Sequence, residues 1–559
     1  MTAFRRLITL TLLSLATTAL LGQEAPVART TEPVSAETDR DANDSRALRL
    51  SLNDAVATTV SKNLGIELQR FEHRIAGEEI RRQYQIFDPV ADAALTLSSA
   101  EQTSLSSFAG GSRRGVSLDF GWNHFLPTGA NYRLNFDNSR GTSSGPGVTF
   151  SPNYTTGLTF AASQPLMRDF GIDVNRRGIN IARNTLGISR ETFRDVLNDT
   201  ALLVETAYLD LVYARRNVEV VKETLFLARD QSRITQIRID VGASAPLDIL
   251  QPRVQIAQTE ETLIRAVASV REAEDRLRQL MNLPQSEWDR PIIPTDSFDY
   301  QAVNIDVAGA IERAYTQRPE VAADVLRTDN ARINVLFAKN QVLPAVDFNI
   351  GYGLAGIAGR VLNPATGNPD PTVPSTAYTD ALESIFSNDF PSWNVGLSFA
   401  MPLRNIGARA AARQAELSLE ESRTSQELTR QNIAVEVRNA ARDVDASARA
   451  ISAARAAREA AESNVDAERK RYENGMTTNF QVLQVQQQLS DARRTELQAL
   501  IGYASARARF NAATGDILAA RGITTELPEV ATEPNAYKFL DRYNWLNYSS
   551  RLTPEEQPK

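Results

Sequence analysis

The chain has 559 residues, a formal net charge of −7, no cysteine and two histidines. Without cysteine it has no disulfide framework, no thiolate metal site and no cysteine nucleophile. His73 and His124 lie too far apart for a local histidine metal motif. The acidic balance argues against a nucleic-acid partner, because no excess of Lys and Arg is available to neutralise phosphates. Length by itself favours three or four domains.

Residues 1–23 have the pattern of a secretory signal peptide. Arg5 and Arg6 precede an uncharged apolar run from Leu7 to Leu21. This run is too short for a comfortable membrane-spanning helix. The alternative is a signal anchor that stays attached. Residues 24–47 are polar and without periodicity, which predicts a flexible lead-in.

An internal repeat divides the rest of the chain and replaces the estimate of three or four domains. Val204 matches Val437 and Gly242 matches Gly475, both 233 positions apart, and this offset persists without a gap over a long stretch. Such a persistent offset indicates a duplicated unit. The predicted organisation is a first copy at 48–284, a linker at 285–302, a second copy at 303–519 and a tail at 520–559.

Both copies have the same predicted order of elements: a helix of about 35 residues, strands, a very long helix, a tight turn and a returning helix of about 35 residues. The strands fall at about 90–164 and 345–400, and the long helices at about 174–240 and 404–473. A helix of that length spans about 100 Å. The second long helix has 12 alanines within 440–467, which allow close packing. The first has the heptad spacing of antiparallel coiled coils, carried by Val204, Ala207, Leu211, Ala214, Val218, Val221, Leu225 and Ala228.

Six segments alternate apolar and polar residues with the period of a strand. In one of them Val116, Leu118 and Phe120 alternate with Ser117 and Asp119. Each segment is about long enough to cross a bilayer as a tilted strand, and strands enter lipid only as part of a closed barrel. A soluble sheet with one buried face explains any single segment equally well. Six together in a secreted chain favour a membrane barrel. The segments are 91–99, 116–123, 132–137, 154–160, 346–352 and 393–399.

The connections between these segments indicate how the barrel is oriented. Residues 126–130 form a short turn, whereas 101–113, 139–153 and 355–391 are long and rich in small and polar residues. Outer-membrane barrels have short periplasmic turns and long outer loops. The smallest barrels use about eight strands, so six are too few to close one. The barrel is therefore predicted to be shared between chains.

This combination resembles the TolC-like outer-membrane efflux protein family, the outer membrane factors. The motifs that carry the resemblance are 163–166 (SQPL) and 401–403 (MPL) at the entries to the long helices, and the helix tips 241–251 and 471–484. The resemblance implies an α+β membrane protein in which a duplicated unit builds a shared transmembrane β-barrel and a long periplasmic α-helical barrel.

The resemblance also implies a function and partners. The chain is expected in the outer membrane, extending into the periplasm, as a homotrimer in contact with outer-membrane lipid, a periplasmic adaptor and an inner-membrane pump. It would be the exit duct of a tripartite efflux or type I secretion system, with no enzyme activity, cofactor, metal or nucleic acid. The alternative is a structural coiled-coil protein that spans the periplasm without transport.

Two departures from the family stand out. Members often contribute four strands each, whereas the first copy here holds four by itself, so a trimer would close 18 strands rather than 12. The family's best-known members narrow the periplasmic mouth with aspartate rings, whose matching positions here are Gln481 and Gln484. Asp248 and Tyr472 are kept. The resemblance implies that a hydrogen bond between these two holds the mouth closed; the alternative for Asp248 is a solvated helix cap.

The helix tips are predicted to dock the adaptor. Gly242 and Gly475 permit the positive φ of a tight turn, and Ser244 and either Thr477 or Thr478 are expected to cap the returning helices. The docking residues are Gly242, Ala243, Ser244, Gly475, Met476, Thr477 and Thr478.

Three further expectations concern single features. Pro252 is expected to kink the helix that it occupies. Carboxylates such as Glu205, spaced along the helices with arginine, are expected on a solvated face. The aromatic-rich tail 528–559 is expected either to pack around the middle of the helical barrel or to be disordered.

Overall fold

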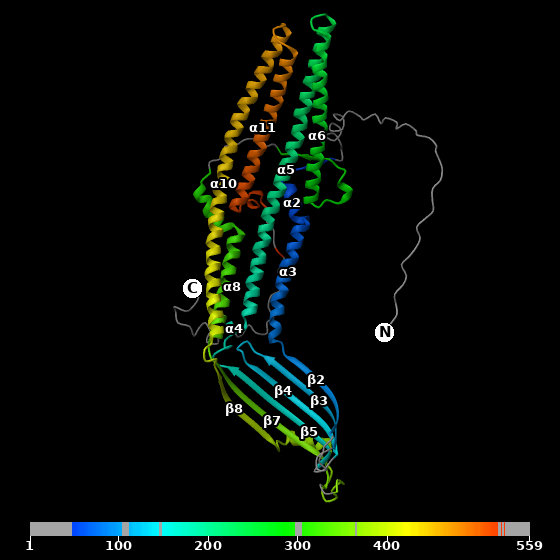
Figure 1. Cartoon of the computed structure of the whole chain (residues 1–559), viewed down its shortest axis with the longest axis vertical. Helices are drawn as coiled ribbons and strands as arrows, with labels where there is room; N and C mark the ends of the chain where they lie inside the picture. Colours follow the sequence, from blue (N-terminus) through cyan, green and yellow to red (C-terminus); the bar gives the residue numbers. More distant parts are fainter. Residues whose placement is uncertain are drawn as a thin grey trace, which may run out of the picture.

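The computed structural model describes residues 47–102, 111–144, 148–296, 305–363, 366–523, Leu527 and Val530. The molecule is elongated, with a curved sheet at one end and long helices that run from it to two hairpin tips at the other (Figure 1). The predicted signal peptide, nearly all of the lead-in and the aromatic part of the tail lie outside the described residues. In the described part of the chain, no helix is long and apolar enough to cross a membrane.

The helices follow the predicted duplication. The first copy holds α2 (Leu52–Lys62), α3 (Leu64–Tyr84), α4 (Ile172–Asn175), α5 (Arg177–Asp240) and α6 (Leu250–Leu280). The second holds α7 (Val307–Gln317), α8 (Pro319–Gln341), α9 (Tyr378–Phe386), α10 (Ile406–Glu473) and α11 (Asn479–Thr514). Short 3₁₀ helices are η1 (Gln85–Phe87), η2 (Pro246–Ile249), η3 (Gln285–Glu287) and η4 (Ala519–Arg521).

The expectation of one opening helix per copy is wrong, because each is broken in two at the same place. Between α2 and α3, Asn63 is extended, and its side chain accepts hydrogen bonds from the N–H groups of Gly65 and Ile66. Between α7 and α8, Arg318 is extended and Pro319 begins the next helix. Proline disfavours a helical conformation in the residue before it. A cap in one copy and a proline in the other thus produce the same corner.

The two long helices confirm the prediction. α5 has 64 residues and α10 has 68, so each spans about 100 Å at 1.5 Å per residue. All eight heptad positions of α5 named from the sequence are buried. Near the sheet, α5 packs between α3 and α8; toward the tips it packs between α6 and α11 (Figure 1). The helices therefore form a wall with α10 along one side and α3 and α6 along the other.

The sheet has six strands in the order β2-β3-β4-β5-β7-β8, with every neighbouring pair antiparallel. The first copy supplies four strands and the second supplies two, as predicted. Several strands extend beyond their predicted ends into the segments expected as outer loops. Their bounds are β2 (Val90–Gln102), β3 (Gly111–Phe125), β4 (Asn131–Ser144), β5 (Phe150–Pro165), β7 (Ala345–Val361) and β8 (Pro391–Ala400).

The main hydrophobic core lies halfway along the helices. There α2 packs on α5, beside a two-stranded parallel sheet of β1 (Leu48–Leu50) and β6 (Ile292–Pro294). The segment predicted as the linker 285–302 thus contributes a strand. Tyr208 of α5 is fully buried, and its hydroxyl donates to the carbonyl of Leu50 at 2.9 Å and to the Asp296 carboxylate at 2.7 Å.

Candidate functional site

The two faces of the six-stranded sheet differ in chemistry. One row of aligned residues across five strands is Trp122, Leu134, Phe160, Tyr352 and Trp393. The adjacent row, which points to the opposite face, is Asp92, Gly121, Asn135, Thr159, Gly353 and Ser392. An apolar face opposite a polar face is the arrangement of a strand with lipid on one side and water on the other.

Both edges of this sheet are open in the single chain. Among the described strands, β2 pairs only with β3 and β8 only with β7. Unpaired backbone groups at a sheet edge are not tolerated in lipid, where water cannot satisfy them. The sheet is therefore an incomplete part of a closed structure.

The two tips of the molecule close with the same turn. In the first, the N–H of Gly242 donates to Ile239 O and that of Ala243 to Arg238 O; in the second, Gly475 donates to Tyr472 O and Met476 to Arg471 O. The two glycines have φ of 77° and 72°. These bonds define a Schellman motif, in which a left-handed residue ends the helix. The duplication predicted from sequence thus extends to individual hydrogen bonds.

The second returning helix begins as expected and the first does not. Thr478 caps α11 by accepting from the N–H of Gln481 at 3.4 Å. In the first copy Ser244 is not the cap, because η2 begins after Ala245, whose N–H donates to the Asp248 carboxylate at 3.0 Å. Pro252 lies in the first turn of α6 rather than inside it, where a missing N–H costs little.

The candidate gate residues lie in the two helix-tip regions, but their contacts differ from the expectation. Asp248 binds its own turn through its side chain. The Tyr472 hydroxyl is 3.5 Å from that of Thr235. The predicted hydrogen bond between Asp248 and Tyr472 is therefore not present within this chain. Gln484 is exposed and Gln481 is half-buried in the first turns of α11.

A different pair of contacts joins the two tips. The guanidinium of Arg238 lies 4.6 Å from the centre of the Tyr472 ring and donates to the Tyr472 carbonyl at 2.7 Å. Gln231 donates to the Asn479 side chain at 2.7 Å, and both of these residues are buried. Tyr472 is among the residues singled out from the sequence, whereas Arg238, Gln231 and Asn479 are not. The repeat in the sequence shows which positions are equivalent, but not which positions of the two copies touch.

A recess of about 480 Å³ lies between α5, α8, α10 and α11 and is rich in carboxylates. Asp195 and Asp199 line it from α5, with Glu320 and Glu436 from α8 and α10. Arg318 binds both of these glutamates at 2.5 Å. The two aspartates lie on the side of α5 opposite the buried Leu197, because two residues along a helix turn it by about 200°.

The carboxylates of this recess should make the free energy of unfolding of the chain fall as pH rises. Burial, followed by the charges of Glu320 and Asp199, raises the pKa of Asp195 to about 6, against the opposing effect of Arg318. The folded chain therefore holds a proton that the unfolded chain has released between about pH 3.8 and 6, so the free energy of unfolding decreases as pH rises through that window. We expect Asp195→Asn to raise the melting temperature at pH 7 and to flatten its decline above pH 4.

The matched control is Asp445→Asn, which removes an exposed carboxylate of α10 paired with Arg449. Melting followed by circular dichroism from pH 4 to 8 distinguishes the two variants. If Asp195→Asn melts below the parent chain at pH 7, the assigned effect of its charge is wrong.

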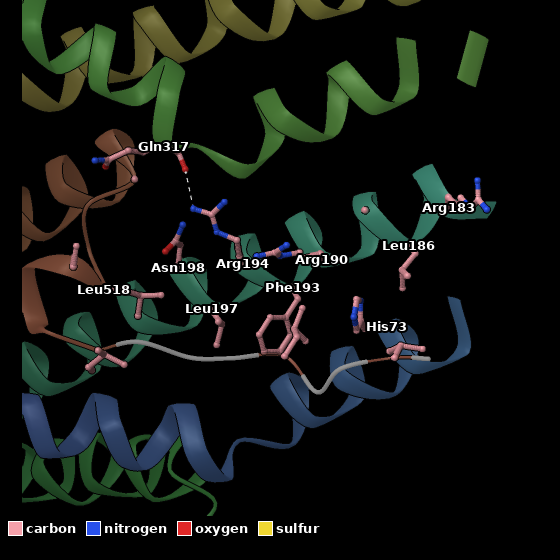
Figure 2. A pocket seen from close by; sticks show the side chains of 16 residues that line it. His73, Arg183, Leu186, Arg190, Phe193, Arg194, Leu197, Asn198, Gln317 and Leu518 are labelled. Atoms are coloured by element: carbon pink, nitrogen blue, oxygen red, sulfur yellow. Dashed lines mark hydrogen bonds between the residues drawn. The ribbon is translucent and has the colours of Figure 1, made fainter. Parts of the chain in front are cut away.

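A wider groove of about 1130 Å³ runs beside α5 where the C-terminal segment crosses it. Figure 2 shows Arg190 and Arg194 of α5 on one side and His73 of α3 on the other. His73 Nδ1 is 2.9 Å from the Ser189 hydroxyl, and burial, with the Arg190 charge, lowers its pKa. Val530 packs against Gly77 of α3 and leaves no room for a side chain there. At Val530 the tail thus lies against the part of α3 that is nearer the sheet. Its aromatic residues lie outside the described residues, so their expected position around the middle of the helical barrel stays a prediction.

Together these features define a class of protein. A two-faced sheet with open edges continues into a single wall of helices about 100 Å long, and the wall ends in two equivalent polar turns. This is the architecture of a channel wall in which a membrane β-sheet is extended by long helices.

Comparison with known proteins identifies the family. The model of the family "Outer membrane efflux protein" matches residues 130–283 and 310–516, and the chain belongs to this family. It is accordingly an outer-membrane protein and not an enzyme. The outer membrane protein TolC of Vibrio cholerae is 22% identical over 303 residues, which cover 54% of this chain and 64% of that relative.

Solved structures share the fold. The CmeC outer membrane channel of Campylobacter jejuni is 15% identical, with 97% of this chain and 99% of that chain covered and a TM-score of 0.59. The open state of the MtrE outer membrane channel of Neisseria gonorrhoeae is 16% identical, with coverage of 84% and 89% and a TM-score of 0.56. The predicted TolC-like α+β fold is thereby confirmed.

Proposed function

We propose that three copies of this chain form the exit duct of a tripartite efflux or type I secretion system. The duct passes small molecules, ions or proteins from a periplasmic adaptor and an inner-membrane pump to the exterior. The observation that carries this proposal is the sheet itself. It has one apolar face and, among the strands that the structure describes, two unpaired edges. It is continuous with a helical wall long enough to extend far into the periplasm.

Exposed apolar stripes at the two sides of the wall support the trimer. Along α3, Leu64, Leu68, Phe71 and Ile75 recur at helical spacing and are exposed. Along α10, Leu417, Leu428 and Val435 do the same. Contact between α3 of one chain and α10 of the next removes both stripes from water. The same rotation pairs β8 of one chain with β2 of the next.

The periplasmic mouth is the proposed docking and gating region. The polar turns around Gly242 and Gly475 present small side chains that suit meshing with adaptor tips, without large apolar burial. Gln481 and Gln484 at the start of α11 would replace a charged ring by a neutral one. Asp248 and Tyr472 remain gate candidates, with Arg238 holding Tyr472 in place.

Conductance of the purified protein in a planar lipid bilayer tests this function. A duct gives discrete current steps, whereas a coiled-coil spacer that is embedded in the membrane as a trimer gives none. A second arm tests the position of the mouth. Gln484→Asp should raise the preference for cations over anions, and an equivalent charge on the exposed flank of α10, Ser463→Asp, should not.

A further inference from the structure

One short helix lies in the segment 355–391, which its composition predicts to be a long outer loop. α9 (Tyr378–Phe386) is in the connection between β7 and β8 and packs on β5 and β7. The Tyr378 hydroxyl donates to Asn138 at 2.8 Å, and the Thr156 hydroxyl donates to the Ala381 carbonyl at 3.0 Å. Asn138 and Thr156 are aligned across β4 and β5. Along their strands they have the same parity as Leu134 and Phe160, so α9 covers the apolar face of the sheet.

The strand beneath α9 is shaped for this contact. Gly356 of β7 is aligned with Thr156, and a Cβ at Gly356 would lie 1.9 Å from the Ala381 carbonyl oxygen. Ala381 and Ile385 are buried against the sheet. Beyond the C-terminus of the helix, the Tyr352 hydroxyl donates to Asn388 at 2.8 Å. The helix is thus fixed to three strands by both packing and hydrogen bonds.

The sides of α9 that do not touch the sheet differ from each other. At about 100° per residue, Leu382 and Phe386 lie on one flank and Asp380 and Ser384 on the opposite flank. Phe386 is 86% exposed, and Phe390, just before β8, is also exposed. Packing on the sheet therefore buries only part of the apolar surface of this segment.

We propose that α9 is an interfacial helix that lies in the outer leaflet of the outer membrane, with lipid as its occupant. Its apolar flank enters the acyl region beside the barrel. Asp380, in the first turn of α9 and close to the outer connection, remains at the water boundary. The surface is continuous with the lipid-facing rows of β5 and β7. Aromatic side chains lie near both ends of α9: Tyr154 is in edge contact with Tyr378 at its start, and Trp393 is aligned with Tyr352, whose hydroxyl binds Asn388 just beyond its end. Barrels carry aromatic residues of this kind where they meet the membrane surface.

The absence of cysteine makes a direct test practicable. Phe386→Cys is labelled with an environment-sensitive fluorophore in phosphatidylcholine–phosphatidylglycerol vesicles that contain nitroxide-labelled lipid. Asn368→Cys in the same outer connection and Ser117→Cys on the polar face are the controls. We expect a blue-shifted emission and strong nitroxide quenching only at position 386. Emission typical of water at position 386 overturns the proposal. So does a shielded label that nitroxide lipid does not quench, because a neighbouring protein surface then covers it.

A second arm tests the seat on β7. Gly356→Ala in the Phe386→Cys background should displace α9 and reduce the quenching. Gly396→Ala on β8, where a new Cβ meets no atom within 4 Å, should leave the quenching unchanged. Equal quenching in both backgrounds shows that the helix does not depend on this seat and overturns the placement. Neither measurement involves transport, so the proposal stands or falls separately from the function of the duct.

Discussion

Excision of the β3–β4 hairpin, residues 103–149, should narrow the barrel of the proposed trimer from eighteen strands to twelve. β2 and β5 would then be joined directly and would remain antiparallel. At a strand spacing of 4.8 Å and a tilt of about 40°, the backbone diameter falls from about 36 Å to about 24 Å. Electron cryo-microscopy of the detergent-solubilised protein measures this diameter directly.

The control for this excision shortens only the outer connection 103–110 and should keep the wide barrel. The same measurement on the parent protein tests the strand number. If its trimer has a barrel of twelve strands, the β3–β4 hairpin lies outside the barrel wall and the prediction is wrong. The helical tube should keep its diameter in both variants, since the helices that build it are untouched.

Replacement of Glu274 by leucine should be the most destabilising single substitution that we predict. Its carboxylate is fully buried; it binds Arg215 at 2.6 Å and Arg278 at 3.1 Å, and accepts from the N–H of Ile292 at 3.1 Å. The Arg278 side chain is only 4% exposed. Loss of the carboxylate removes a fully buried partner from Arg215 and Arg278 and leaves Arg278 with Asp275, whose side chain is 57% exposed. Breaking a buried ion pair costs about 3–5 kcal/mol, and the substitution also releases β6 from α6.

Glu260→Leu is the matched control on the same helix. Glu260 pairs with Arg229 at 2.7 Å, but both side chains are about half exposed, and such pairs contribute less than about 1 kcal/mol. Unfolding in guanidinium, followed by the helical circular dichroism signal, compares the two variants. The double variant Glu274→Leu, Arg278→Leu should recover part of the loss. A Glu274→Leu protein as stable as the control would show that the buried carboxylate contributes little.

Local pattern was sufficient for most of the architecture. The heptad of α5, the alternation of six strands and the turns at Gly242 and Gly475 each depend on residues close in sequence, so periodicity predicts them directly. The duplication then fixed the order of elements. The prediction of a single opening helix in each copy was wrong. A one-residue break at Asn63, or before Pro319, hardly changes the spacing of the apolar residues around it.

Local spacing does not predict the environment of individual charged residues. Glu205 was expected on a solvated face, and that expectation is wrong. It is buried and paired with Arg521, far away in the sequence. A carboxylate and an arginine spaced along one helix can pair with each other at the surface, or the carboxylate can pair with an arginine of another helix. The spacing in the sequence is the same in both cases. Only the packing of η4 onto α5 distinguishes the two cases.

By itself, the sequence determined the type and order of the main elements, the length of the two long helices and the two faces of the sheet, because these follow from periods of two and 3.6 residues. The motifs at the helix entries and tips indicated the family. The tertiary structure decided which distant residues meet. It joined Arg238 to Tyr472 across the two copies, placed Glu274 among its arginines and seated α9 on Gly356. These contacts depend on how whole elements pack, and a local period carries no information about the partner on the other side.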